Sequence, residues 1–272
     1  MKFETWLVPT FANEEKSSVA TAAVIDVLRA TTVATTALAA GAEKILTCRS
    51  VEQARDWREG DAAARPRLLC GERQCRPIDG FDLGNSPGDY SPALVAGRQL
   101  VMTTTNGTAA IEAAANAEHV ILACFANLSA VVETLIQRDQ DVGKDHVTRL
   151  MCSGTDGAVT IEDVLCAGAI LAMCHRQLSD SPRFFDGPIE LIDDASGIAL
   201  AVWQHSLTHE NVSDAETLAA RLSTTQGGRN LIAAGYESDL LDCASIDVFQ
   251  TVPTRTERSP ATFIRSDIRP SG

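Results

Sequence analysis

The sequence predicts an α/β fold with a largely parallel sheet. Apolar runs of strand length alternate with helix-like patterns along much of the chain, as a parallel sheet covered by helices requires. Several of these runs are followed by small polar residues and then by a helical pattern. The 272 residues are enough for one or two domains with a large buried core.

Each predicted strand is a short run dominated by apolar residues. In order, the runs are AAVIDVL (22–28), KILTC (44–48), RLLC (67–70), QLVMTT (99–104), HVILA (119–123), VTRLMC (147–152) and IDVFQT (246–251). The intervening segments carry apolar residues at helical spacing. Helices are therefore predicted over residues 31–40, 51–58, 108–117, 129–138, 161–177, 195–205 and 215–222.

Two connections and one end have a different composition. Residues 72–92 are rich in Gly, Pro, Asp, Asn and Ser without sustained periodicity, which predicts a long ordered loop, and loops of this length usually carry function. Residues 180–188 form a second turn-rich connection. We expect one unit over residues 1–253, with room for two subdomains, and a polar, poorly constrained tail over residues 254–272.

The charge balance excludes some classes of partner. Lys and Arg number 23 against 36 Asp and Glu, a net charge of −13. Phosphate-backbone binding needs clustered cations, and no basic run of the required length occurs, so neither nucleic acid nor an anionic membrane surface is an expected partner. No signal-peptide pattern and no apolar stretch of about 18 residues is present, so we expect a cytoplasmic protein.

The eight cysteines indicate buried reduced thiols. They are irregularly spaced and mostly lie in apolar segments, with no C-x-x-C pair, which argues against a disulfide framework or a zinc site. Cys70 and Arg76 have the C-x5-R spacing of cysteine phosphatases. Glu72 would put a negative charge inside the phosphate-binding loop of such an enzyme, which disfavours that interpretation.

The first strand-to-helix junction places an acid and a base together. In VIDVLRATT, residues 24–32, Asp26 falls near the end of a strand and Arg29 lies at the turn before the next helix. Ligands of open α/β sheets bind at such strand ends. A buried ion pair is the alternative, because a lone acid inside a strand is costly.

The segment TTTNGT, residues 103–108, is a candidate phosphate-binding junction. Backbone N–H groups of Gly107, Thr108 and Ala109 and nearby threonine hydroxyls can hold phosphate oxygens. Helix capping by Thr105 or Asn106 is the alternative and needs no ligand.

Two further segments offer oxygen ligands. In CSGTDGAVTIED, residues 152–163, Glu162 and Asp163 could bind a divalent cation, although acids in a first helical turn are favourable without one. Thr160 and Asp163 also have the spacing of a capping box. In the long loop, carboxylates and an amide supply the hard oxygens that magnesium prefers: Glu72, Asp79, Asp82 and Asn85.

Together with GFDLGNSP (80–87) and AAGYESDLLDCASIDVFQTVP (233–253), these motifs resemble the 2-phosphosulfolactate phosphatase family, also called ComB. The resemblance spans residues 20–253. It implies a three-layer α/β/α fold with a mixed sheet. It also implies a magnesium-dependent hydrolase that converts 2-phospho-3-sulfolactate to sulfolactate and phosphate, a step of coenzyme M biosynthesis where that pathway exists.

The resemblance also implies roles for individual positions. Asp26 and Arg29 would be catalytic, with Arg73 or Arg76 assisting Arg29. Substrate would be bound by Arg29, Asn85, Ser86, Thr105, Asn106, Gly107, Thr108 and Gly154. Magnesium would be held by Asp26, Glu72, Asp82, Glu162 and Asp163. A cation is expected on electrostatic grounds as well, because a substrate with several negative charges must enter an acidic protein.

Two alternatives remain open at this stage. A related phosphatase would act on another 2-hydroxy-acid phosphate, such as phosphoglycolate or phospholactate. A binding protein for a phosphorylated metabolite would keep the phosphate cradle without a cluster of acids. Attack by water and a phospho-aspartate intermediate are not distinguished. The size and class of the protein suggest a homodimer.

Overall fold

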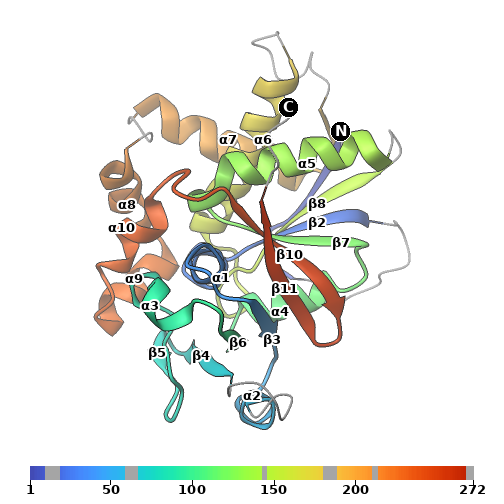
Figure 1. The fold of residues 1–272 in the computed structure, drawn as a ribbon. Coiled ribbons are helices and arrows are strands. Elements are labelled where there is room, and N and C mark those ends of the chain that lie inside the picture. The colour runs from blue at the N-terminus through green and yellow to red at the C-terminus, as the bar shows by residue number, and fades with distance from the viewer. Residues whose placement is uncertain (10–18, 59–66, 143–145, 180–188, 210–213, 268–272) are drawn as a thin grey trace.

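The structure, a computed structural model, describes residues 1–9, 19–58, 67–142, 146–179, 189–209 and 214–267. A mixed sheet with helices on both faces confirms the predicted α/β class (Figure 1). Its strands are β1 (Lys2–Trp6), β2 (Val19–Ile25), β3 (Lys44–Thr47), β4 (Leu68–Arg73), β5 (Arg76–Pro77), β6 (Gln99–Thr103), β7 (His119–Ala123), β8 (Val147–Cys152), β9 (Glu190–Leu191), β10 (Thr251–Arg258) and β11 (Ala261–Asp267).

The helices follow the predicted order, with additions near the C-terminal end. They are α1 (Ala30–Ala39), α2 (Val51–Asp56), α3 (Pro92–Val95), α4 (Gly107–Ala113), α5 (Leu128–Val142), α6 (Ile161–Leu178), α7 (Asp194–His209), α8 (Ala215–Ser223), α9 (Gln226–Ala234) and α10 (Asp239–Ala244). Sequence patterns did not predict α3, α9 or α10. No described helix is long and apolar enough to cross a membrane.

The sheet consists of two parallel blocks joined by an antiparallel hairpin. Its strand order is β5-β4-β6-β3-β11-β10-β7-β2-β8-β1-β9. Strands β4, β6 and β3 form one parallel block, and β7, β2, β8, β1 and β9 form the other. Between them, β10 pairs with β7 at Thr254 and Ile121, and β11 pairs with β3 at residues 261–263.

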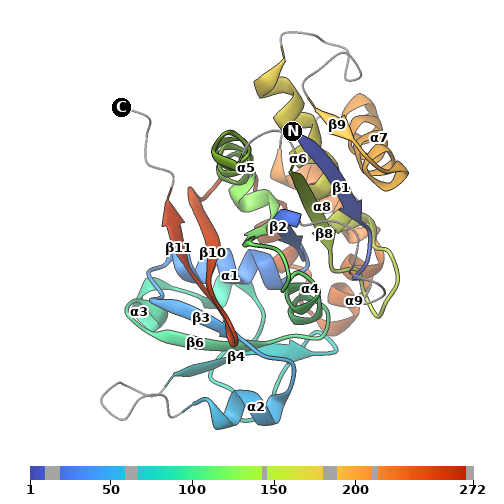
Figure 2. The ribbon, with the colours of Figure 1, turned by 90° about the vertical axis from the view of Figure 1, so that its right-hand side faces the viewer.

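The two blocks share a core around α1, which is seen end-on near the centre of Figure 1. This core contains Val24 of β2, Ile45 of β3, Met102 of β6 and Phe263 of β11, all buried. The other face of the second block packs against α5, α6 and α7 (Figure 2). Helix α2 covers the outer face of the first block, through residues such as Ala54. Helices therefore lie on both faces of the sheet, which is the layered arrangement that the family resemblance implied.

Helix α1 can be buried although four of its ten residues are threonines. The hydroxyl of Thr32 donates to the carbonyl of Val27 (2.9 Å), and that of Thr35 donates to the carbonyl of Thr31 (2.8 Å). A hydroxyl that donates to a carbonyl of its own helical turn needs no water. These internal hydrogen bonds allow the start of α1 to lie directly below the carboxyl end of β2.

The expectation of a poorly constrained polar tail is wrong for residues 254–267, the part of that segment that the structure describes. Thr251–Arg258 and Ala261–Asp267 form the hairpin at the middle of the sheet, and Val252 and Phe263 are buried. β-Branched and aromatic residues favour strands, but the charged residues between them interrupt that pattern in this segment. The strand predicted over 246–251 accordingly begins at Thr251. Residues 180–188, predicted to be a turn-rich connection, lie outside the described residues.

Candidate functional site

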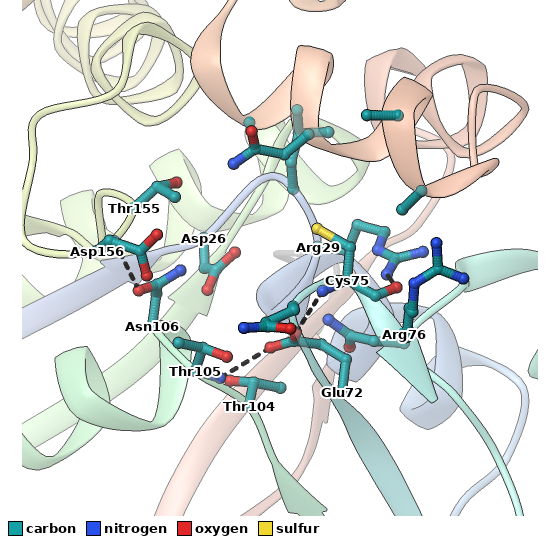
Figure 3. Close-up of a pocket in the computed structure, with 17 residues that line it drawn as sticks. Asp26, Arg29, Glu72, Cys75, Arg76, Thr104, Thr105, Asn106, Thr155 and Asp156 are labelled. Atoms are coloured by element: carbon teal, nitrogen blue, oxygen red, sulfur yellow. Dashed lines mark hydrogen bonds between the residues drawn. The ribbon is translucent and has the colours of Figure 1, made fainter. Parts of the chain in front are cut away.

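A pocket of about 350 Å³ lies where the carboxyl ends of β2, β4 and β6 meet (Figure 3). It is lined by the β2–α1 junction, the β4–β5 turn, the β6–α4 loop, the turn after β8 and one face of α9. The sequence predicted functional residues in the first three of these segments and in the turn after β8. Helix α9, which closes the remaining side, was not predicted.

Asp26 follows β2 and points into this pocket (Figure 3). One of its carboxylate oxygens accepts a hydrogen bond from the backbone N–H of Ala30 (3.2 Å) at the start of α1. The pKa of Asp26 is raised to about 7, mainly by burial and in smaller part by the nearby carboxylates of Glu72 and Glu162, while the Ala30 hydrogen bond acts in the opposite direction. A lining carboxyl group with such a pKa is a candidate catalytic group.

Gly107 allows α4 to approach Asp26. A Cβ atom at this position would lie 2.6 Å from the Asp26 carboxylate and 2.6 Å from the side chain of Ala30. Glycine is thus needed where two loops come together, and Gly107 supports the pocket without lining it.

Arg29 is buried and held on three sides. Its guanidinium donates to the carboxylate of Asp239 (2.5 Å) and to the carbonyl of Cys75 (2.9 Å), and it lies 4.6 Å from the centre of the Tyr236 ring. The Ser86 hydroxyl donates to the other oxygen of Asp239 (2.5 Å). The ion pair of Arg29 is therefore formed with Asp239, in contrast to the alternative that paired it with Asp26.

Glu72 joins two walls of the pocket. One carboxylate oxygen accepts from the N–H of Thr105 (2.8 Å) in the β6–α4 loop, and the other accepts from the N–H of Cys75 (2.9 Å) in the β4–β5 turn. Gln74 and Cys75 both have left-handed backbone angles, with φ of 53° and 62°. A tight turn of two such residues is strained for side chains larger than glycine, and Glu72 holds it in place.

Asp163 has a structural environment that sequence reasoning did not foresee. Its carboxylate accepts from the N–H of Val27 (2.9 Å), the N–H of Ser153 (3.1 Å) and the N–H of Gly154 (3.0 Å). It thereby fixes the ends of β2 and β8 below the pocket. Burial, followed by the charges of Asp26 and Glu162, raises the pKa of Asp163 well above its usual range. The predicted capping box is absent, because Thr160 makes no side-chain hydrogen bond to the start of α6.

Glu162 packs against Gly227 of α9, a residue that lines the pocket. A Cβ atom on Gly227 would come within 2.0 Å of one Glu162 oxygen. The other oxygen is buried and has no hydrogen-bond partner among the described residues. Burial raises the pKa of Glu162 as well.

The structure brings together only part of the predicted site. Asp26, Arg29, Glu72, Asn85, Thr105 and Asn106 line the pocket. Asp82 does not, because it pairs with Arg58 (2.8 Å), accepts from the N–H of Leu69 (2.8 Å) and borders a different hollow. The structure therefore does not bring Asp82 together with the other predicted metal ligands at this pocket.

Besides Gly107, three further predicted substrate contacts lie outside the lining. The hydroxyl of Ser86 donates a hydrogen bond to Asp239. The N–H of Thr108 already donates to the hydroxyl of Thr104 (3.2 Å), so it is not free for a phosphate. Gly154 has a φ of 61°, and a Cβ there would lie 2.3 Å from the carbonyl oxygen of Ala158, so its glycine is required by the turn.

Sequence reasoning missed several residues around the pocket. Asp239 and Tyr236, which hold Arg29, fall in the segment 233–253, whose resemblance to the family was noted without assigning residues. Asp156 lines the pocket and its N–H donates to the side-chain oxygen of Asn106 (3.1 Å; Figure 3). Asn230 lines it from α9. No short-range pattern indicates these positions, since they reach the pocket only through the tertiary fold.

The cysteine-phosphatase alternative does not fit the structure. Cys70 is fully buried in β4 and burial raises its pKa to about 12, so it is not a thiolate near neutral pH. All eight cysteines are free, as predicted, and seven are buried. Cys75, half-buried, is the exception and lines the pocket.

A magnesium ion would meet a smaller ligand set than predicted. Over the described ranges no three carboxylate, imidazole or thiol groups come close enough to bind one ion. Asp82 lies elsewhere, and the oxygens of Glu72 and Asp163 accept backbone N–H groups. However, buried oxygens of Glu162 and Asn85 have no hydrogen-bond partner, and Asp26 faces the pocket. These donors fit magnesium, which usually takes one or two carboxylates, with waters and phosphate oxygens completing its shell.

Comparisons with known proteins agree with this architecture. A family model described as 2-phosphosulpholactate phosphatase matches residues 7–258. A relative from Thermotoga petrophila, named probable 2-phosphosulfolactate phosphatase, is 37% identical over 235 residues, which cover 86% of this chain and 88% of the relative. Relatives of the same name from Caldanaerobacter subterraneus (36% over 230 residues; 85% of each chain) and from a Synechococcus strain (38% over 245 residues; 88% and 89%) are similar throughout. The chain thus belongs to the 2-phosphosulfolactate phosphatase family.

Proposed function

We propose that the protein is a magnesium-dependent phosphatase that hydrolyses 2-phospho-3-sulfolactate to 3-sulfolactate and phosphate. Family membership and the names of its relatives support the substrate. The observation that carries the proposal is a buried carboxyl group, Asp26, with a pKa of about 7 at the floor of a polar pocket. A protein that only binds phosphorylated metabolites has no need of such a group.

Asp26, Glu162 and Asn85 are the residues that would hold magnesium. When bound, the ion neutralises charge on the phosphate oxygens and so permits attack by a nucleophile. Burial raises the pKa values of Asp26, Glu162 and Asp163, and neighbouring carboxylates add to the rise for Asp26 and Asp163. A bound cation would favour the charged form of each carboxyl group.

Arg29 orients the phosphate. Asp239, the carbonyl of Cys75 and the Tyr236 ring fix its guanidinium before substrate arrives, so little side-chain freedom is lost on binding. A guanidinium has five N–H donors, and those not taken by Asp239 and Cys75 are free to face phosphate oxygens.

Asp26 acts at the phosphorus centre. As a carboxylate it serves as the nucleophile or as the base for an attacking water, and labelled phosphate distinguishes the two routes. Recovery of label on Asp26 after rapid quenching identifies a covalent phospho-aspartate. Transfer of solvent oxygen directly to phosphate, with no labelled protein, identifies attack by water.

The test is phosphate release from 2-phospho-3-sulfolactate by the purified protein, with added magnesium and with a chelator. We expect activity only with magnesium, and a loss of at least about 100-fold in kcat for Asp26→Asn, in the range typical for removal of one acid or base group. Glu133→Gln on the exposed side of α5 also removes one negative charge and serves as the control. Normal magnesium-dependent turnover by Asp26→Asn would contradict the proposal.

A further inference from the structure

We propose that Arg76, on the β4–β5 turn, binds the second anionic group of the substrate and makes the pocket selective for phosphate esters that also carry a carboxylate or sulfonate. This inference rests on the proposed function and deepens it, because it names the residue that separates acidic phosphate esters from simple ones.

One positively charged residue of the pocket lining, Arg76, makes no ion pair with a described residue. Asp26, Glu72 and Asp156 contribute negative charge, and Arg29 and Arg76 contribute positive charge. The charge of Arg29 is balanced by Asp239. Arg76 is exposed, lines the pocket and makes no ion pair with any described residue. An ester with a second negative group therefore finds its counter-charge at Arg76.

The backbone that carries Arg76 is rigidly placed relative to Asp26 and Arg29. Residue 76 pairs with Arg73 across the β4–β5 ladder. The preceding residue, Cys75, is bound through both backbone groups, since its N–H donates to Glu72 (2.9 Å) and its carbonyl accepts from Arg29 (2.9 Å). Only the side chain of Arg76 is left to adjust to a ligand.

The polar groups of the pocket also define an orientation. In Figure 3, Arg76 lies on the same side of the pocket as Arg29, whereas Asp156 and Asn106 lie on the opposite side. An acid group near Asp156 would be repelled, and the same group near Arg76 is attracted. Arginine is suited to this task, because its planar fork matches the paired oxygens of a carboxylate or sulfonate.

The experiment compares kcat/KM for three substrates: 2-phospho-3-sulfolactate, phospholactate and phenyl phosphate, the last of which has no second anionic group. The variants are Arg76→Ala and Arg76→Lys. Arg176→Ala is the control, because this substitution removes the same charge at a position outside the pocket lining. Arg176 is exposed near the C-terminal end of α6. Thermal unfolding of each variant verifies that it is folded.

We expect Arg76→Ala to reduce kcat/KM for the two acidic esters at least about ten times more than for phenyl phosphate, mainly through KM, as loss of a charge-assisted hydrogen bond implies. Arg76→Lys keeps the charge without the fork and should recover part of the preference. Arg176→Ala should leave the preference unchanged. Equal losses on all three substrates in Arg76→Ala would overturn the inference.

Binding of the product 3-sulfolactate, measured by calorimetry, separates this inference from the proposed function. We expect Kd to rise about tenfold in Arg76→Ala and to stay constant in Arg176→Ala. If the wild-type protein hydrolyses none of the three esters, the proposed function fails, and the product measurement still tests Arg76. A Kd that Arg76→Ala does not change means that Arg76 is only a solvated surface residue.

Discussion

Arg29 shows how a single residue of the site depends on distant parts of the chain. Its partner Asp239 follows 210 residues later, and both are buried, with 3% and 2% of their surfaces exposed. A buried charge is stable only when it is paired and hydrogen-bonded. Arg29 lines the pocket, but no local pattern in the sequence marks the acid that balances its charge.

Replacing Asp239 by Asn should leave a buried guanidinium without its counter-charge. We expect a loss of about 3 kcal/mol in the free energy of unfolding, typical when one partner of a buried pair is removed. Urea denaturation measures this loss. Asp242→Asn, an exposed position on the same helix, should change stability by less than about 0.5 kcal/mol. Equal stabilities for the two variants would show that the pair is not important for the fold.

The buried carboxyl group of Asp26 should make stability depend on pH. Its pKa is about 7 in the folded protein against an ordinary 3.8, so between about pH 4 and 7 the folded state binds a proton that the unfolded state releases. Stability due to this group is thus present at low pH and is lost as the pH rises to 7. Each pKa unit corresponds to about 1.4 kcal/mol, so the loss is at most about 4 kcal/mol.

The measurement is urea unfolding of the wild type and of Asp26→Asn between pH 4 and 8, with a chelator to remove metal ions. The asparagine variant lacks this titration, so its stability relative to the wild type should increase across that range. Glu133→Gln should follow the wild-type profile. Parallel profiles for wild type and Asp26→Asn would show that Asp26 titrates normally.

At the scale of single elements, α9 forms the wall of the pocket that the sequence did not predict. It is a nine-residue helix whose N-terminal Thr225 side chain accepts from the N–H of Gly228, and it ends at Gly235 in the left-handed conformation. These are ordinary start and stop signals of a helix. Sequence patterns did not predict this helix, although it contributes Gly227 and Asn230 to the pocket.

Gly227→Ala should displace α9 from the pocket. The added methyl group would meet a Glu162 oxygen at 2.0 Å, so either the helix or the buried Glu162 side chain must shift. We expect a loss of about 1 to 3 kcal/mol in stability, the usual range for overpacking, together with at least a tenfold loss in kcat/KM.

Gly197→Ala in α7 is the matched control for this substitution, because nothing lies within 4 Å of its Cβ position. Alanine favours a helix over glycine by up to about 1 kcal/mol, so this variant should be slightly more stable and fully active. Denaturation curves measure the stability of both variants, and phosphatase assays measure their activity. Full activity of Gly227→Ala would mean that α9 is not a fixed wall.

Most elements could be predicted because their patterns are local. The predicted segments over β3, β4, β6, β7 and β8, and over α1, α5, α6 and α8, overlap the observed ones closely. Strand β1 was missed, since only Phe3 and Thr5 of its five residues are buried and so short an alternation is a weak signal. The site was predicted in part for the same reason: the motifs mark strand ends, but burial and pairing of each side chain depend on the tertiary fold.

The acidic residues illustrate this limit most directly. Five carboxylates were expected at one magnesium ion, and all five stand in motifs that the family resemblance selects. In the structure, Asp163 accepts hydrogen bonds from the backbone at two strand ends, and Glu72 accepts them from two loops. Asp82 forms an ion pair with Arg58. A motif in sequence does not distinguish an acid that binds a ligand from one that holds the neighbouring backbone.

At the scale of the whole molecule, the β10–β11 hairpin connects the two blocks of the sheet. Phe263 of β11 is completely buried in the core around α1, whereas its neighbour Ile264 is 38% exposed. The hairpin thus contributes both hydrogen bonds and apolar burial between parts of the sheet that do not otherwise pair.

Phe263→Ala should destabilise the protein by about 3 to 5 kcal/mol, because it removes a large buried side chain and leaves a cavity. Ile264→Ala, on the opposite face of the same strand, should cost much less. Chemical denaturation of both variants tests this difference. Similar, small losses would mean that the hairpin is peripheral to the core.

The position of this hairpin in the sheet also determines when the fold can be completed during synthesis. Strands β3 and β7 leave the ribosome long before residues 251–267 are translated, yet they reach each other only through β10 and β11. The nascent chain must therefore carry two incomplete sheet edges until the hairpin emerges. The sheet is complete only when the hairpin has inserted between these two edges.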